Sequence, residues 1–200
     1  LSTIGLTVVS GRTFDLDRFP TDSSAVILNE KAVAVLGKTP ESVIGTQFVN
    51  DFQNGSYKLL VTTGGPLAQG SYLAEYGTSA ELTAATIIKI GFDANKLVAI
   101  PTPDVHRDRT YASAIELKKW LDSADMNIES LDIYSLGPHS RRSWLLFHYV
   151  FAPDKAVGIV ALVNRSYDSK RWWKTSNGVR TVISEAIAYF YARFIFKPQK

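Results

Sequence analysis

From Tyr57 onward, short apolar segments alternate with stretches of helical periodicity, and this alternation limits the folds open to the chain. The first such segment, Tyr57 to Thr63, is rich in β-branched residues and ends on Gly64 and Gly65. Further strands are predicted at Lys96 to Ile100, Leu131 to Leu136 and Val157 to Val163. Apolar strands joined by helical crossovers are typical of a parallel sheet that is covered on both faces. The sequence therefore predicts an α/β fold, a Rossmann-like parallel sheet with helices on both faces, plus a short α+β N-terminal segment.

The intervening stretches predict four helices. Ser71 is a candidate N-cap for the first of them, with Glu75 in its first turns. The predicted helices are Tyr72 to Ile90, Thr110 to Leu121, Ser143 to Val150 and Gly178 to Phe196. Residues 137–142, which follow the third strand of this part, are expected to form a turn. A further strand should precede Tyr57 in a complete domain, and only Ala25 to Leu28 could supply it.

Composition excludes several classes of function. The chain has 200 residues and a net charge of +3, which permits anionic small ligands but is too weak to indicate nucleic-acid binding. It has no cysteine, so disulfides, thiolate catalysis and cysteine-ligated metals are excluded. No apolar run reaches the ~18 residues of a membrane span, and the chain as given is expected to be soluble. It begins at Leu1 and not at Met, so we expect a fragment or a processed product, with membrane proximity through flanking sequence left open.

Polar and basic residues follow each predicted strand from Tyr57 onward. In a parallel sheet these loops share one edge, where ligand sites form. Arginine forks match phosphate and carboxylate oxygens, and a Gly-Gly turn exposes backbone N–H groups. The sequence therefore predicts a pocket for an anionic ligand. The candidate ligand-binding residues are Gly64, Gly65, Arg109, Arg141 and Arg142, and the candidate acid or base groups are Glu75, Asp108 and His139.

Each of these residues also has a purely structural interpretation. A glycine pair after a strand is more often a tight turn than a phosphate cradle, and it forms neither a G-x-G-x-x-G nor a P-loop motif. Surface Arg and Asp residues are usually solvated ion pairs. His106 and His139 lack a metal-ligand spacing, so no metal is predicted. The aromatic face of the last helix is most simply core packing, with membrane-surface docking as the minority interpretation.

Residues 1–47 differ in character from the rest. G-R-T-F at Gly11 to Phe14, D-S-S-A-V-I-L-N-E-K-A-V at Asp22 to Val33, and Ile44-Gly45 resemble the periplasmic core domain of MacB/FtsX-type ABC-transporter permeases. In that family the segment is structural and mediates partner contacts, and the membrane helices expected around it are absent here. We therefore predict an N-terminal fragment or appendage at 1–47 and the main α/β domain at 48–200.

The remainder resembles the ElyC/SanA/YdcF family of Rossmann-like envelope-associated proteins. The matching stretches are T-T-G-G at Thr62 to Gly65, Glu75, D-R-T-Y-A-S-A at Asp108 to Ala114, L-G-P-H-S-R-R-S-W at Leu136 to Trp144, and Arg171 to Trp173. The resemblance implies a polar pocket at these loops, a role in cell-envelope or peptidoglycan-precursor metabolism, and a bacterial envelope location. Some members are associated with S-adenosylmethionine binding, which we do not carry over. The family's opening strand and glycine loop should precede residue 48, where the permease-like segment stands instead.

Three functions follow from these patterns. The first is an envelope-associated domain that binds a phosphorylated or nucleotide-type small molecule and acts on it. The second is a non-catalytic ligand-binding or regulatory module that uses the same pocket. The third is an interaction segment of an ABC-transporter permease, carried by residues 1–47. The sequence leaves open the reaction, any cofactor, the oligomeric state, and whether residues 1–47 replace the missing first strand.

Overall fold

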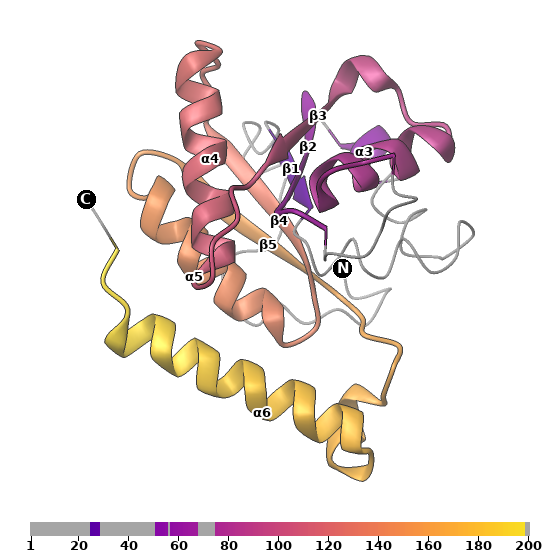
Figure 1. Cartoon of the computed structure of the whole chain (residues 1–200), viewed down its shortest axis with the longest axis vertical. Coiled ribbons are helices and arrows are strands. Elements are labelled where there is room, and N and C mark those ends of the chain that lie inside the picture. The colour runs from indigo at the N-terminus through magenta and orange to yellow at the C-terminus, as the bar shows by residue number, and fades with distance from the viewer. Residues whose placement is uncertain (1–24, 29–50, 56, 68–74, 199–200) are drawn as a thin grey trace.

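The computed structural model describes residues 25–28, 51–55, 57–67 and 75–198. Within them, five parallel strands form one sheet in the order β3-β2-β1-β4-β5 (Figure 1). The strands are β1 (Ala25–Leu28), β2 (Leu59–Gly64), β3 (Leu97–Pro101), β4 (Ser130–Leu136) and β5 (Ala156–Leu162). The mixed α/β class predicted from the sequence is therefore confirmed.

β1 lies in the middle of this sheet. Its residue Val26 pairs with Leu60 of β2 on one side and with Asp132 of β4 on the other. The missing first strand is thus supplied by Ala25 to Leu28, the one segment that could do so. The domain boundary expected at residue 47 runs through a sheet to which both sides contribute. The rest of residues 1–47 lies outside the described residues.

A helix follows each of the later strands. They are α3 (Ser79–Lys89), α4 (Arg109–Ser123), α5 (His139–Phe151) and α6 (Ser176–Phe190), with a π-helical turn η3 (Tyr191–Ile195) and two 3₁₀ helices, η1 (Ala94–Lys96) and η2 (Ser169–Lys174). In Figure 1, α4 and α5 lie on the left of the sheet, α3 lies on the right, and α6 runs along the bottom.

Successive residues of the strands point in opposite directions and so belong to two separate hydrophobic clusters. Val61 and Ile133 pack with Leu117 of α4 and Phe147 of α5. Their neighbours point the other way, so that Leu60 of β2 packs with Ile87 of α3. A third cluster joins α6 and η3 to α5. Its members are Leu145, Leu146 and Ala192, with Tyr111, Trp144, Tyr149, Tyr189 and Phe196 packed against them.

Two predicted helix starts are wrong. α3 begins at Ser79 and not at Tyr72, because Thr78 and Glu81 form a capping box in which each side chain accepts from the other's backbone N–H. Glu75 therefore precedes the helix, and the proposed cap Ser71 lies outside the described residues. α5 begins at His139 and not at Ser143, so His139, Arg141 and Arg142 are helical and not part of a turn.

Candidate functional site

The turn from β4 into α5 brings the most polar part of the core to the carboxyl edge of the sheet. Gly137 adopts a left-handed conformation, with φ of 50°, which glycine reaches without steric cost. Its N–H donates to the carbonyl of Leu162 at 2.8 Å, which ties the turn to the end of β5. The helix then starts at once, so the side chain of His139 is buried, with 4% of the residue exposed.

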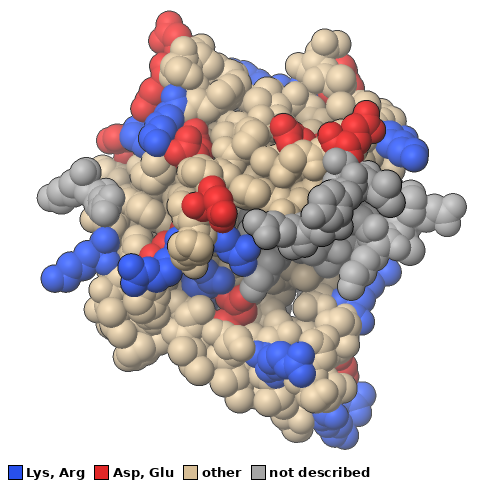
Figure 2. Space-filling model, in the orientation of Figure 1, with Lys and Arg blue, Asp and Glu red and all other residues tan. Residues whose placement is uncertain are grey.

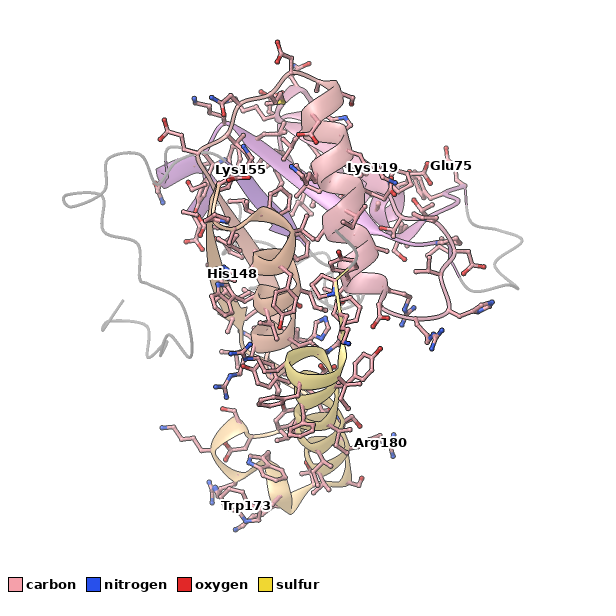
Figure 3. All side chains as sticks on the ribbon, turned by 90° about the vertical axis from the view of Figure 1, so that its left-hand side faces the viewer. Glu75, Lys119, His148, Lys155, Trp173 and Arg180 are labelled. Carbon is pink, nitrogen blue, oxygen red and sulfur yellow. The ribbon has the colours of Figure 1, made fainter. Side chains whose placement is uncertain are left out.

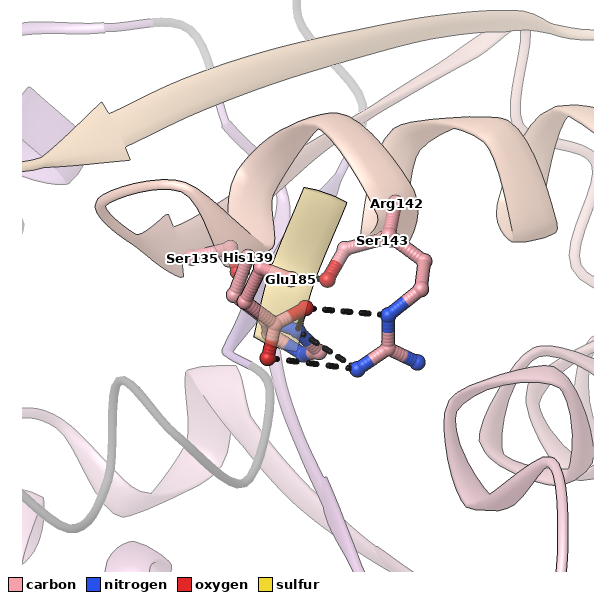
Figure 4. A network of polar contacts seen from close by, with 5 residues as sticks. All are labelled: Ser135, His139, Arg142, Ser143 and Glu185. Carbon is pink, nitrogen blue, oxygen red and sulfur yellow. Dashed lines mark hydrogen bonds and ion pairs between the residues drawn. The ribbon is translucent and has the colours of Figure 1, made fainter. Parts of the chain in front are cut away.

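Three charged or titratable side chains meet beside this turn (Figure 4). His139 Nδ1 lies 3.0 Å from Glu185 Oε2, and Glu185 comes from α6 and is 6% exposed. Arg142 Nε donates to the same oxygen at 3.0 Å, and its Nη2 lies 3.5 Å from Oε1. We refer to His139, Arg142 and Glu185 as the buried triad. It joins the start of α5 to the middle of α6.

Two contacts of Nδ1 bear on which nitrogen of His139 carries the proton. Nδ1 also lies 2.9 Å from Arg142 Nη2, and one ring nitrogen cannot both donate to a carboxylate and accept from a guanidinium. Both contacts are charge-assisted, since the guanidinium and the carboxylate are each ionised, so they are compatible with either tautomer; with the proton on Nδ1, the ring donates to Glu185. In this tautomer Nε2 is the proton-accepting nitrogen. A carboxylate that orients an imidazole in this way is the arrangement found in general-base sites.

Small hydroxyl side chains surround the triad. Ser135 at the end of β4 and Ser143 on α5 are buried, and their oxygens lie 3.2 Å apart. Ser140 follows His139 in the first turn and is 4% exposed. Its hydroxyl has no hydrogen-bond partner among the described residues. A buried hydroxyl without a partner is unusual in a folded protein and calls for an explanation.

Gly64, the last residue of β2, has a packing role. A Cβ at Gly64 would lie 2.8 Å from the Cβ of Ser79, so glycine is what allows the first turn of α3 to approach the strand. The carbonyl of Gly64 accepts from Thr102 N–H at 2.9 Å, and that of Gly65 accepts from Ser79 N–H at 2.8 Å. Gly65 is more open, because a Cβ there would meet only the Thr102 carbonyl, at 3.8 Å. The prediction that both glycines approach a ligand stays a prediction.

The candidates after β3 stand at the start of α4. Asp108 is the N-cap and adopts a left-handed conformation, with φ of 57°. Its side chain makes no capping hydrogen bond. Arg109, the first residue of the helix, is exposed, as is His106 in the preceding loop. Behind them, Thr102 and Ser113 pair through their hydroxyls at 3.0 Å, in the buried layer.

The other predicted site residues are spread more widely. Glu75 is exposed and lies at the outer side of the molecule in Figure 3. Arg141 is exposed, with its guanidinium 4.7 Å from the centre of the Tyr189 ring. Arg142 was predicted to hold a ligand anion, yet two of its nitrogens contact Glu185. The loop after β5 leads into η2, where Asp168 caps the helix and pairs with Arg171 at 3.1 Å. The Lys170 N–H and the Arg171 side chain lower the pKa of Asp168.

A second buried polar cluster lies on the other side of the sheet from α5. Tyr57 donates to Asp132 at 3.3 Å and Tyr134 donates to Asp51 at 3.1 Å. Burial raises the pKa of both phenols well above their ordinary value, and the neighbouring carboxylates raise it further. Burial also raises the pKa of Asp51, although the hydrogen bond from Tyr134 acts in the opposite direction. Tyr134 belongs to the hydrophobic cluster that contains Ile87 of α3, and Tyr57 packs against that cluster, so both phenols support the core beside α3.

Glu185 is the functional candidate that sequence reasoning missed. It is the only acidic residue between Asp168 and the C-terminus, in an otherwise apolar and basic helix. A single carboxylate in such a helix is either buried together with a partner or exposed on the helix surface, where it breaks up the apolar face. That pattern was available, but nothing in the sequence indicated that its partners would come from α5.

Two further features can be stated for the described part of the chain. No group of three or more His, Cys, Asp or Glu residues there is arranged to hold a metal ion. None of its helices is both long and apolar enough to cross a membrane.

No protein-family model matches the chain, and no curated protein matches it in sequence.

Proposed function

We propose that this chain is a Rossmann-like, doubly wound α/β domain that binds a phosphorylated or otherwise anionic small molecule at the carboxyl edge of its sheet. The observation that carries the proposal is the strand order. The chain runs outward from β1 through β2 to β3 and then returns to β4 on the other side of β1. Ligands of open α/β sheets bind outside the carboxyl ends of the strands at such a reversal. The turn that leads to His139 starts beside it.

The first turn of α5 supports an anionic ligand. A helix N-terminus presents backbone N–H groups and a positive potential. No side chain caps this one, because its N-cap residue is Pro138. Ser140 adds a buried hydroxyl without a partner among the described residues, a donor that a phosphate oxygen would satisfy. Arg141 adds positive charge in the same turn.

The buried triad gives the same site a catalytic option. With Nδ1–H donating to Glu185, His139 is oriented for proton transfer through Nε2. Arg142 neutralises Glu185 and holds it in place. In this proposal Arg142 is a positioning residue, and the anion is held by the helix N-terminus, Ser140 and Arg141. The envelope-precursor substrate implied by the family resemblance fits this chemistry, since such precursors carry phosphate.

A thermal-shift screen tests binding. The ligands are inorganic phosphate, nucleotides, sugar nucleotides, polyprenyl phosphates and S-adenosylmethionine. A ligand that binds only the folded state raises stability by about 2.7 kcal/mol at a hundredfold excess over its Kd. Ser140→Ala should abolish the shift without lowering the basal melting temperature, because it removes an unsatisfied hydroxyl. His148→Gln is the matched control, since His148 lies in the last turn of the same helix and stacks on Trp144. The proposal would be overturned if none of these ligands raised the melting temperature.

The same ligand separates an enzyme from a binding module. If the triad is catalytic, His139→Gln should abolish turnover of the bound ligand while leaving its thermal shift largely intact. If the domain is a binding module, the wild-type protein binds the ligand and leaves it unchanged. A role as an interaction segment of a permease rests on residues 1–47 alone and would give neither result.

A further inference from the structure

The outer side of α6 and η3 carries an apolar stripe that the protein leaves exposed. Ile183, Ile187, Phe190 and Phe194 recur at the spacing of one helix face. Their exposed fractions are 47%, 67%, 58% and 68%. Ile195 and Trp173, at 59% and 58%, extend the stripe at its two ends. Most of the exposed large hydrophobic residues in the described part of the chain belong to this one surface. A contiguous patch of this kind marks an interaction site.

The helix cannot turn this stripe inward. Glu185 points from the opposite side of α6 into the buried triad, and Ala192 is packed against α5 at 2% exposure. Rotating the helix would expose Ala192 and break the contacts of Glu185 with His139 and Arg142. The buried triad therefore sets the register of α6, and the stripe faces outward as a consequence.

Basic residues frame the stripe. They are Lys170, Arg171, Lys174, Arg180, Arg193 and Lys197, all exposed. Glu185, which is buried, is the only carboxylate between residues 169 and 198, and the exposed Asp168 just before them pairs with Arg171. In Figure 2 the acidic residues lie mostly over the upper part of the molecule, and the lower part carries separate basic residues among residues that are neither basic nor acidic. In Figure 3, Trp173 and Arg180 both lie toward the foot of the molecule, on different sides of α6.

We propose that this surface, formed by η2, α6 and η3, docks lengthwise on an anionic lipid bilayer. A helix with an aromatic and aliphatic face between Lys and Arg residues is the arrangement that lies in a membrane interface. Anionic headgroups attract the cations and the apolar residues enter the acyl boundary. A second copy of the chain fits less well, because a two-fold interface would bring the same cations of both copies together. The proposal does not depend on the ligand of the buried triad, which lies on the other side of α6.

Vesicle co-sedimentation tests the proposal. The full chain is mixed with vesicles of phosphatidylcholine alone or with about 30% phosphatidylglycerol, a charge content near that of an anionic membrane. The wild-type protein should pellet with the anionic vesicles and be released as salt is raised. Ile187→Ser/Phe194→Ser should reduce the bound fraction about tenfold or more, because the apolar face supplies the insertion. Lys170→Gln/Lys174→Gln/Arg180→Gln should also reduce it and remove most of the salt dependence.

Matched variants outside the surface serve as controls. Leu82→Ser/Ile88→Ser changes two exposed apolar residues of α3, and Lys58→Gln/Lys89→Gln/Lys96→Gln removes three exposed cations elsewhere. Both should bind as the wild type does. Brominated lipid should quench Trp173, and Trp173→Phe should remove that quenching. The proposal fails if the wild type does not pellet, or if control and surface variants bind equally. It also fails if the protein is a dimer without lipid and Ile187→Ser/Phe194→Ser makes it a monomer, since the stripe then joins two copies.

Discussion

Gly64 and Gly65 are adjacent in the chain, yet an added methyl group has different consequences at each. At Gly64 the new Cβ meets the Cβ of Ser79 at 2.8 Å and the backbone nitrogen of Ala80 at 3.1 Å. Gly64→Ala should therefore push α3 away from β2 and cost about 1–3 kcal/mol of stability. Gly65→Ala meets only one carbonyl at 3.8 Å and should cost less than about 1 kcal/mol. Urea unfolding of the two variants measures this difference, and equal losses would show that the contact at Gly64 is unimportant.

The individual site residues show how far sequence reasoning reaches. His139 and Arg142 are three residues apart, a spacing that brings two side chains together in a helix, but a turn was expected at 137–142. Glu185 could not be placed beside them, because a contact across that distance in the chain depends on how α6 packs. The close packing of α3 against Gly64 could not be predicted for the same reason. A glycine that lets a ligand approach the backbone and a glycine that lets a helix pack closely cannot be told apart in the sequence.

At the level of elements, α3 depends on its N-terminal cap. The Thr78 hydroxyl accepts from Glu81 N–H, and the Glu81 carboxylate accepts from Gly77 N–H, Thr78 N–H and the Thr78 hydroxyl. Thr78→Ala should cost about 0.5–2 kcal/mol. Thr78→Ser keeps the hydroxyl and should cost much less. Thermal unfolding compares the two, and a serine variant as unstable as the alanine variant would contradict the capping role.

The phenols of the second buried cluster predict how stability changes at alkaline pH. Tyr57 and Tyr134 have a raised pKa in the folded state, whereas in the unfolded chain they ionise near pH 10. Above that pH the unfolded chain loses protons that the folded state retains, so the free energy of unfolding falls as pH rises. The slope is about 1.4 kcal/mol per pH unit for each phenol, and below about pH 9 the stabilisation is complete.

Denaturant unfolding between neutral and strongly alkaline pH measures that slope. Tyr57→Phe/Tyr134→Phe should flatten it, because neither position can then ionise. Thr78→Ala removes no phenol, so its free energy of unfolding should be lower at every pH but should fall with the same slope as in the wild type. A double variant with an unchanged slope would show that other groups control the alkaline transition.

The elements also differ in how well the sequence predicted them. The strands were predicted to within two residues at each end, since buried parallel strands are short, apolar and β-branched. The helix starts were harder. T-S-A-E at Thr78 to Glu81 has the pattern of a capping box, but the helical periodicity was extended back through Gly77. α5 starts after Pro138 with no capping side chain, so it lacked the usual signal.

At the scale of the whole molecule, the sheet depends on β1. This strand is four residues long and hydrogen-bonds to a neighbour on each side. Ile27→Pro removes an N–H from the central strand and should abolish the cooperative unfolding transition. Ile27→Val keeps the donor and should retain it. A chain of residues 48–200 should behave like the proline variant. Cooperative unfolding of that shorter chain would show instead that residues 1–47 are an appendage.

The whole-molecule arrangement was the least accessible to sequence reasoning. Strand type and the α/β class follow from local patterns, but the order of the strands depends on partners far apart in the chain. Ala25 to Leu28 was recognised as the only candidate for a missing strand. Its surroundings resembled another family, and that resemblance favoured a boundary at residue 47 that the sheet crosses.

The position of β1 also determines when the sheet can form during synthesis. β1 leaves the ribosome first, and its partner β2 follows soon after. Its other partner, β4, leaves the ribosome much later, because Asp132, which pairs with Val26, lies about half of the chain further on. Until then one side of the strand has no neighbour and exposes unpaired backbone groups that invite association with other chains. Contacts so distant in sequence form slowly. The nascent sheet should therefore depend on chaperones until β4 has been synthesised.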